Sequence, residues 1–211
     1  MKKYLRSFGR VKGHKLSKWQ ESLISEFLLT IAPKNLTNNI WFEIGFGAGE
    51  HLIQLINERD DENITIIGCE PYINGAVKAI KYIHDNHCKK AYIYHDDARE
   101  LLKTLNPKSV EKFFILFPDP WPKKRHHKRR IINQFMIELL ISKLSGHGSI
   151  TIATDHVSYA QWISDILTQY SHKYLKFNSA EECERAGILT RYCQKALARD
   201  DEINLFILDN I

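Results

Sequence analysis

The residues best suited to chemistry are acids and glycines that follow short apolar runs. The first group is the segment 43–49, in which Gly45, Gly47 and Gly49 follow Glu43 with G-x-G-x-G spacing. Glycine permits sharp turns and a close approach of backbone to a ligand. A dinucleotide pyrophosphate instead requires G-x-G-x-x-G, and an acid ahead of the glycines favours a cationic group. A purely structural tight turn is the alternative interpretation.

Further acids end the next two apolar runs. Glu70 lies 27 residues after Glu43, and Asp96 and Asp97 precede a helical segment. A carboxylate at position 70 can accept both hydroxyls of a ribose. An acid at 96 or 97 can accept from an adenine amino group or cap the helix. Together these acids describe adenosine with a cationic appendage, which fits S-adenosylmethionine and does not fit NAD.

A proline-rich segment carries the third group. Pro118, Pro120 and Pro122 alternate with Asp119 and Trp121, and fixed φ angles predict a stiff, extended loop. Six cations and two histidines follow within residues 123–130. A rigid carboxylate and an aromatic ring beside a basic patch suggest an unpaired base held near a phosphate backbone. A structural turn before a basic helix start is the alternative.

The remaining motif is Thr154-Asp155-His156, which follows another apolar run. Asp155 is predicted mainly as the N-cap of the next helix, and it could also line the ligand crevice. The ten histidines show no metal-ligand spacing, so no metal site is predicted.

Strands and helices that alternate along the chain must position these groups. A capping box at Ser17 opens a helix whose apolar positions run to Ile31, and Pro33 marks its stop. Strands are predicted at 40–44, 64–69, 91–95, 113–117, 149–153, 174–177 and 203–208. Further helices are predicted at 49–58, 73–87, 98–105, 128–144 and 156–170.

This alternation predicts an α/β fold of the Rossmann-like type. The apolar strands favour a mostly parallel sheet of about seven strands with helices on both faces. The last two strands lack a clear helix between them, so an antiparallel final hairpin is expected. In such sheets ligands bind at the carboxyl ends of the strands, where the acids lie. We expect a single domain over residues 1–211, with residues 1–16 as a basic N-terminal arm.

Charge is concentrated in two places. The net charge is +5, and residues 1–20 and 123–130 hold 13 of the 30 basic side chains and no acid. The rest of the chain has 17 basic and 25 acidic residues. Concentrated cations on an acidic body predict binding to a polyanion such as nucleic acid or anionic lipid. Solvated, mobile basic segments are the alternative.

Other classes are excluded by composition. No run approaches the ~20 apolar residues of a membrane span, and the basic start lacks the apolar core of a secretory signal. The four cysteines show no CxxC spacing. Free thiols and a cytoplasmic location are therefore expected, with no membrane partner.

Several of these segments together resemble one known family. RSFGRVKGHKLS, EIGFGAGE, Glu70, FPDPWPKKRHHKRR, ATDH and LTRYCQKA are similar to segments of the tRNA (guanine-N7)-methyltransferases, in register over nearly the whole chain. The resemblance implies a class I methyltransferase fold with S-adenosylmethionine as cofactor. It also implies tRNA as the partner, methylated at guanosine 46 of the variable loop. No obligate protein partner is inferred.

The resemblance also implies roles for individual residues. Those at cofactor-binding positions are Glu43, Gly45, Gly47, Glu70, Asp97 and Asp119. Asp119 is in addition the catalytic position. Those at substrate-binding positions are Lys123, Asp155, Thr190, Arg191 and Tyr192. The cations expected on the RNA backbone are Lys124, Arg125, Lys128, Arg129 and Arg130.

One position departs from the family pattern. The family has Thr-x-x-Glu where this chain has Thr190-Arg191-Tyr192-Cys193, and a cysteine cannot supply a fixed carboxylate. Glu181, Glu182 or Glu184 could substitute. Two alternatives to an active methyltransferase therefore stay open. One is a methyltransferase-fold tRNA-binding protein without turnover, and the other, disfavoured by the glycine spacing, is a nicotinamide-dependent oxidoreductase.

Overall fold

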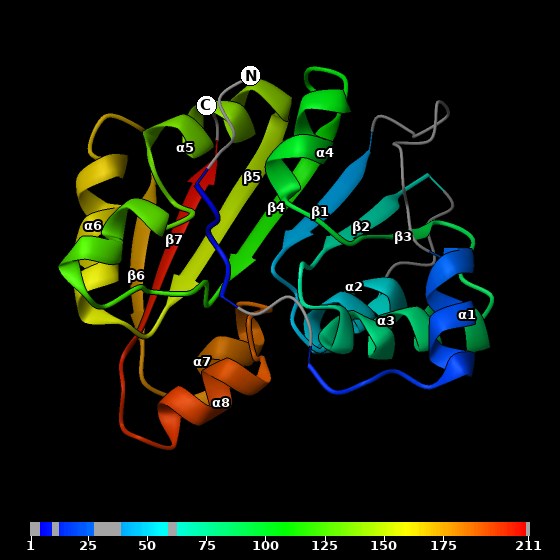
Figure 1. The fold of residues 1–211 in the computed structure, drawn as a ribbon. Coiled ribbons are helices and arrows are strands. Elements are labelled where there is room, and N and C mark those ends of the chain that lie inside the picture. Colours follow the sequence, from blue (N-terminus) through cyan, green and yellow to red (C-terminus); the bar gives the residue numbers. More distant parts are fainter. Residues whose placement is uncertain (1–4, 10–12, 28–38, 59–62, 210–211) are drawn as a thin grey trace.

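A seven-stranded sheet forms the centre of the molecule (Figure 1). The computed structural model describes residues 5–9, 13–27, 39–58 and 63–209. The strand order is β3-β2-β1-β4-β5-β7-β6, with β1 to β5 parallel and β7 antiparallel to both its neighbours. The predicted fold class is confirmed. The strands are β1 Ile40–Ile44, β2 Thr65–Cys69, β3 Ala91–Tyr94, β4 Val110–Leu116, β5 Leu144–Thr154, β6 Lys173–Phe177 and β7 Ile203–Asp209.

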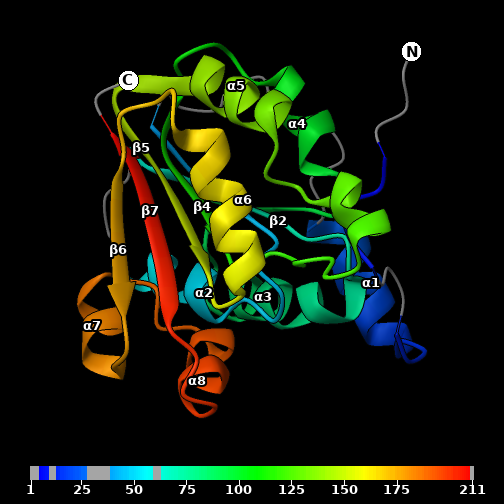
Figure 2. The ribbon, with the colours of Figure 1, turned by 90° about the vertical axis from the view of Figure 1, so that its left-hand side faces the viewer.

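Helices cover both faces of the sheet (Figures 1 and 2). Side chains of α4, α5 and α6 share one core cluster with β1, β4, β5 and β7. Helices α1, α2 and α3 pack on the opposite face, and α7 and α8 cover the far end of that face. The helices are α1 Lys18–Phe27, α2 Glu50–Glu58, α3 Ile73–Asp85, α4 Ala98–Thr104, α5 Gln134–Lys143, α6 Val157–Leu167, α7 Ala180–Arg185 and α8 Arg191–Leu197, with a 3₁₀ helix η1 at Lys124–Arg129.

The apolar character of β1 follows from burial on both faces. Ile40, Phe42 and Ile44 alternate toward α4–α6, whereas Trp41 points to the α1–α3 side. Every residue of β1 is buried. A strand buried on both sides needs a nearly continuous apolar run, which is what the sequence has.

The helix predicted at 128–144 begins six residues later, at Gln134. Asn133 caps it, because its Oδ1 accepts a hydrogen bond of 3.0 Å from the backbone N–H of Met136. The preceding cations lie in η1, separated from α5. Ile131 and Ile132 continue the apolar pattern without belonging to the helix, so periodicity alone placed its start too early.

Two helices that sequence patterns missed lie between β6 and β7. The antiparallel pairing of these strands is as expected, but α7 and α8 connect them in place of a hairpin turn. Both helices are short, and α7 depends on a capping box between Ser179 and Glu182. The capping box at Ser17 is also present, with Gln20 as its partner. The predicted end of that helix, Ile31 and Pro33, lies outside the described residues. Within the described part of the chain, no helix has the length and apolar character needed to span a membrane.

Candidate functional site

A cleft of about 380 Å³ opens at the carboxyl ends of β1, β2 and β4. The chain leaves β1 for β2 on one side and reaches β4 on the other, so this is the switch point at which open α/β sheets bind ligands. The cleft is lined by residues of five segments and by two further side chains: Ser7, Phe8, Gly9; Ile44, Gly45, Gly47; Cys69, Glu70, Pro71, Tyr72; Asp97, Ala98; Ile115, Phe117, Pro118, Asp119; and the single residues Ile131 and Tyr192.

The glycine turn after β1 forms part of the cleft wall. Gly45 and Gly47 have φ values of +78° and +60°, a region that side chains rarely adopt. A Cβ on Gly45 would meet no atom within 4 Å, so its backbone faces open space. A Cβ on Gly49 would lie 2.8 Å from that of Ala79, so this glycine lets the turn pack on α3. The turn thus presents bare backbone to a ligand.

Glu70 joins the ends of β1 and β2. Its Oε2 accepts from the backbone N–H of Gly47 at 2.8 Å, and its Oε1 accepts from that of Tyr72 at 2.7 Å. The residue is 8% exposed, and burial raises the pKa of its carboxyl although both N–H donors act in the opposite direction. Each oxygen retains acceptor capacity, so the carboxylate is suited to receive hydroxyl donors from the cleft.

Asp97 has the capping role that the sequence offered for it, and its adenine-binding role stays a prediction. Its Oδ1 accepts from the backbone N–H of Arg99 at 3.1 Å, which caps α4, and from Nε of the same residue at 2.8 Å. Its Oδ2 pairs with the second guanidinium nitrogen of Arg99. Asp97 also lines the cleft. Arg99 is 4% exposed, so this acid is held in a fixed orientation.

Glu43 is predicted to contact the cofactor, and in the structure its side chain is buried beside His51. It is 3% exposed, and its Oε2 lies 3.1 Å from Nδ1 of the equally buried His51 on α2. Glu43 is not one of the described residues that line the cleft. Since β1 side chains alternate, Glu43 points to the same face of the sheet as Trp41, toward α2, where it pairs with His51.

The proline-rich loop after β4 has a strained backbone. Phe117 and Trp121 bracket it with φ values of +53° and +45°, which is costly for aromatic residues. Asp119 faces the cleft between them. Its Oδ2 accepts from the backbone N–H of Gly9 at 3.2 Å. Burial raises the pKa of Asp119, while that N–H and the charge of Arg129 act to lower it.

Arg130 corrects the prediction that all the cations of this segment contact RNA. It is 1% exposed, and its guanidinium lies 4.8 Å from the ring centroid of Tyr159. It donates to the carbonyl of Pro120 at 2.9 Å and to both the carbonyl and the hydroxyl of Ser158. A buried guanidinium cannot reach a phosphate, so Arg130 positions the proline-rich loop instead.

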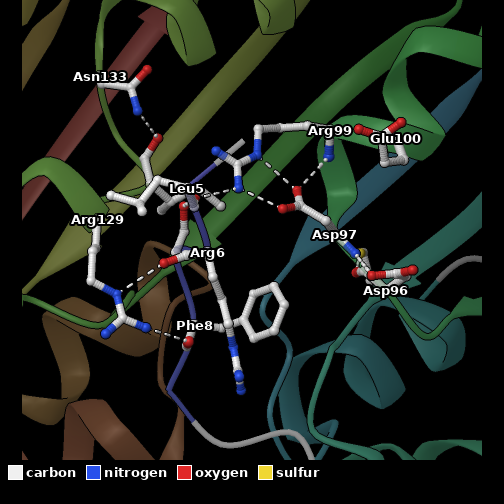
Figure 3. Close-up of polar contacts among 12 residues, drawn as sticks. Leu5, Arg6, Phe8, Asp96, Asp97, Arg99, Glu100, Arg129 and Asn133 are labelled. Carbon is white, nitrogen blue, oxygen red and sulfur yellow. Dashed lines mark hydrogen bonds and ion pairs between the residues drawn. The ribbon is translucent and has the colours of Figure 1, made fainter. Parts of the chain in front are cut away.

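The other cations of the segment divide into two kinds. Lys123, Lys124, Arg125 and Lys128 are exposed and form no ion pair with any described residue, so they stay candidates for phosphate contacts. Arg129 is half-buried and donates to the carbonyls of Arg6 and Phe8. In Figure 3, Arg129 and Arg99 lie on opposite sides of residues 5–9.

Residues 5–9 are the part of the site that sequence reasoning missed. Ser7, Phe8 and Gly9 line the cleft, although the sequence indicated only a basic arm. Their contacts to the body of the protein run mostly through backbone groups. Backbone contacts leave no pattern of side-chain types, so only the family resemblance of the segment RSFGRVKGHKLS pointed to these residues.

The candidate site residues of the C-terminal part of the chain lie in different surroundings. Tyr192 is 57% exposed and lines the cleft, whereas Arg191 is exposed at the start of α8. Thr190 caps α8 by accepting from the backbone N–H of Cys193 at 3.1 Å. Asp155 is not the N-cap of α6, which is His156. Asp155 pairs instead with Arg199 at 2.8 Å, and it is not among the described residues that line the cleft.

Cys193 points away from the cleft. It is fully buried in a cluster with Cys183, Ile188 and Ala196, and burial raises the pKa of its thiol. Thr-x-x-Glu has the spacing of a capping box, in which the glutamate reaches back to the first residue. In this chain the backbone N–H of Thr190 donates to the carbonyl of Ile188 instead. None of the acids at 181–184 lines the cleft.

The charges of the cleft decide which ligand it fits. Three carboxylates line it, those of Glu70, Asp97 and Asp119, and its described lining residues include no lysine, arginine or histidine. Such a wall favours a cationic ligand and disfavours a pyrophosphate. Bare backbone at Gly45 and Gly47 leaves room for an amino-acid chain, and the acceptors suit a nucleoside. The residues present therefore fit S-adenosylmethionine.

The sheet order, the antiparallel β7 and the anionic cleft at the switch point define a class I S-adenosylmethionine-dependent methyltransferase fold. Residues 37–205 match the family model described as "Putative methyltransferase". The chain belongs to the tRNA (guanine-N7)-methyltransferase family. A relative from Wolbachia pipientis wMel, named tRNA (guanine-N(7)-)-methyltransferase, is 40% identical over 82% of this chain and 75% of its own.

Solved structures agree on the fold. A 16S rRNA methyltransferase, KamB, matches with a TM-score of 0.58 and 12% identity over 93% of this chain and 94% of its own. A phosphoethanolamine N-methyltransferase of Haemonchus contortus, solved with S-adenosylhomocysteine, matches with a TM-score of 0.55 and 14% identity over 90% of this chain. The chain spans about half, 52%, of that longer enzyme. At these identities the likeness concerns the fold alone.

Proposed function

We propose that this chain transfers the methyl group of S-adenosylmethionine to N7 of guanosine 46 in the variable loop of tRNA. The observation that carries the proposal is the position of Asp119, which precedes four exposed cations and faces, from a rigid loop, a cleft whose described lining residues include no cation. The family membership supports the guanine N7 chemistry. Position 46 rests on the resemblance of the motifs alone.

The cleft residues divide the binding task between them. S-adenosylmethionine supplies, when bound, a methyl group on a positively charged sulfur. Glu70 is proposed to accept the ribose hydroxyls, and Asp97 the adenine amino group. Gly45 and Gly47 allow the backbone to approach the ligand closely. Glu43 is proposed to act indirectly, through His51 and the glycine turn.

Asp119 is the proposed catalytic residue. Guanine N7 has a free lone pair and no proton, so no general base is needed and alignment supplies much of the rate. The base becomes positive as the methyl group arrives. A fixed carboxylate stabilises that charge, or holds the base by accepting from its N1–H and N2–H groups. The strained loop and the Arg130 contact to Pro120 keep Asp119 in place.

The RNA is proposed to bind over the exposed cations of 123–128, with Tyr192 and Arg191 at the cleft mouth. Tyr192 offers an exposed aromatic ring beside Gly47, since a Cβ on that glycine would lie 3.7 Å from it. Aromatic rings of this kind stack on unpaired bases. Asp155 pairs with Arg199 through Oδ2, so a direct role in substrate binding would use its Oδ1.

The test is a methyl-transfer assay with purified protein, S-adenosylmethionine and unmodified tRNA, followed by mass-spectrometric mapping of the methylated nucleoside. We expect 7-methylguanosine at position 46 and no product on a tRNA with adenosine there. Methylation at another guanosine would contradict position 46 but would still support methyl transfer to a guanine of tRNA. Binding of both ligands without transfer would favour the inactive RNA-binding alternative.

A further inference from the structure

Residues 5–9, here called the strap, are tied to the body of the protein along their whole length. The carbonyls of Leu5 and Ser7 each accept one hydrogen bond of 3.0 Å, from Arg99 and from the indole Nε1–H of Trp121. The N–H of Gly9 donates to Asp119. All these partners lie more than 90 positions away in the sequence.

Arg129 makes the most extensive contact with the strap. Its Nε donates to the carbonyl of Arg6 at 3.0 Å, and a second guanidinium nitrogen donates to that of Phe8 at 3.2 Å. The guanidinium also stacks on Trp121, 3.7 Å from the ring centroid. A planar fork of donors matches two carbonyls held side by side, which a lysine ammonium cannot do equally well.

The second anchor is Arg99, on the opposite side of the strap (Figure 3). Its guanidinium binds both oxygens of Asp97 and the carbonyl of Leu5. One buried side chain therefore connects the strap to an acid of the cleft. Since Ser7, Phe8 and Gly9 line the cleft, the strap forms one of its walls.

We propose that the strap closes over the bound cofactor and that Arg129 is the positioning residue that holds it closed. This inference rests on the proposed function, because it takes the ligand of the cleft to be the cofactor. It also gives Arg129 a role different from that of its exposed neighbours. Loss of Arg129 should loosen cofactor binding even when no RNA is present, whereas loss of an RNA-contacting cation should not.

The experiment compares Arg129→Ala, Arg129→Lys and Lys128→Ala, in RNA-free buffer. S-adenosylhomocysteine is the probe, and its affinity and dissociation rate are measured by calorimetry and by competitive displacement. We expect Arg129→Ala to weaken binding about tenfold or more and to speed dissociation, given two lost charge-assisted hydrogen bonds. Arg129→Lys should be intermediate. Lys128→Ala, which removes the same charge from an exposed site, should match the wild type.

A second readout needs no cofactor. Trypsin cleavage after Arg6 should be slow while the strap is docked and several-fold faster in Arg129→Ala, with Lys128→Ala again unchanged. Trp121→Phe removes the donor to Ser7 and leaves a smaller ring under Arg129, so it should show the same change to a smaller degree. It is the second test in case the Arg129 variant misfolds.

The two proposals fail in different ways. If the wild type binds S-adenosylhomocysteine and Arg129→Ala binds it equally well, the strap inference is overturned. If the wild type does not bind it, the proposed function is overturned, and the trypsin readout alone decides whether Arg129 holds the strap. Equal cleavage rates in wild type and Arg129→Ala would then overturn the strap inference too.

Discussion

The guanidinium of Arg130 donates a hydrogen bond of 2.9 Å from Nε to the carbonyl of Pro120, next to Asp119. This hydrogen bond joins two residues that are ten positions apart, and it closes the segment between them into a loop with both ends fixed. Arg129, one residue earlier, faces the strap, and Lys128 faces solvent. Three adjacent cations thus have three different surroundings, and substitutions at them should have three different effects.

Arg130→Ala should act through stability. Its loss leaves the carbonyl of Pro120 without its donor and opens a space beside Tyr159, so we expect the free energy of unfolding to fall by about 2–3 kcal/mol. Denaturant unfolding monitored by circular dichroism measures this. Lys128→Ala is the matched control and should lie within about 0.5 kcal/mol of the wild type. A fully stable Arg130→Ala protein with reduced salt dependence of RNA binding would contradict this role.

Exposed cations should act through RNA affinity alone. A Lys124→Ala, Arg125→Ala, Lys128→Ala triple variant should bind tRNA more weakly, with the slope of log affinity against log salt reduced by about 0.7–0.9 per cation removed. Filter binding over a series of salt concentrations provides the measurement. An unchanged slope would show that these side chains do not meet phosphates.

Asp119→Asn should act on turnover. The amide keeps the size of the side chain and removes the charge, so we expect single-turnover methyl transfer to slow by about 10²–10³-fold. Glu181→Gln, at an exposed position of α7 outside the cleft, should leave the rate unchanged. A normal rate in Asp119→Asn would exclude charge stabilisation by this carboxylate. A slow Glu181→Gln would restore the substitute-acid hypothesis.

Cofactor affinity should fall on acidification. The fall should occur at a higher pH than it would if the Glu70 carboxyl had the pKa of an ordinary glutamate. Burial raises the pKa of Glu70, and protonation removes an acceptor that the ribose hydroxyls need. Binding is therefore strongest above the raised pKa and is lost as the pH falls through it. Calorimetry with S-adenosylhomocysteine across the acidic range measures the profile. For Glu70→Gln we expect weak binding of S-adenosylhomocysteine and a smaller dependence of its affinity on pH.

The C-terminal motif should tolerate change at Cys193 better than at Thr190. Cys193→Ala removes a small buried group outside the cleft, so we expect a loss of about 1 kcal/mol in stability and normal methyl transfer. Thr190→Ala removes the N-cap of α8, which costs about 1 kcal/mol and disturbs the helix that presents Tyr192 to the cleft. Its tRNA affinity should therefore fall as well. Inactivity of Cys193→Ala would assign the thiol a role that its burial does not indicate.

Much of the fold could be predicted because most strands are short and apolar and several are followed by a distinctive residue. Glu70 and Asp119 come at strand ends, so their meeting at one sheet edge follows from parallel topology. Glu43 is different, since it lies within β1 and strand alternation turns it away from the cleft. The position of Glu43 just before the glycines in the sequence does not indicate which face of the sheet its side chain occupies.

Other features depended on contacts that residue types do not encode. The cations of 123–130 look alike in sequence, and only the packing of Tyr159 and the carbonyls of the strap separate Arg130 and Arg129 from the rest. Helices α7 and α8 are too short to show periodicity. The strap contacts the body of the protein mostly through its backbone, so the types of its side chains do not indicate these contacts.

The anionic wall of the cleft also bears on the order in which products leave. Methyl transfer moves one positive charge from the cofactor to the base. The attraction of Glu70 and Asp97 for their ligand therefore weakens at the same moment as the attraction of Asp119 for the base grows. On the proposed mechanism we therefore expect the anionic wall to hold the spent cofactor, which has lost that charge, less tightly than S-adenosylmethionine.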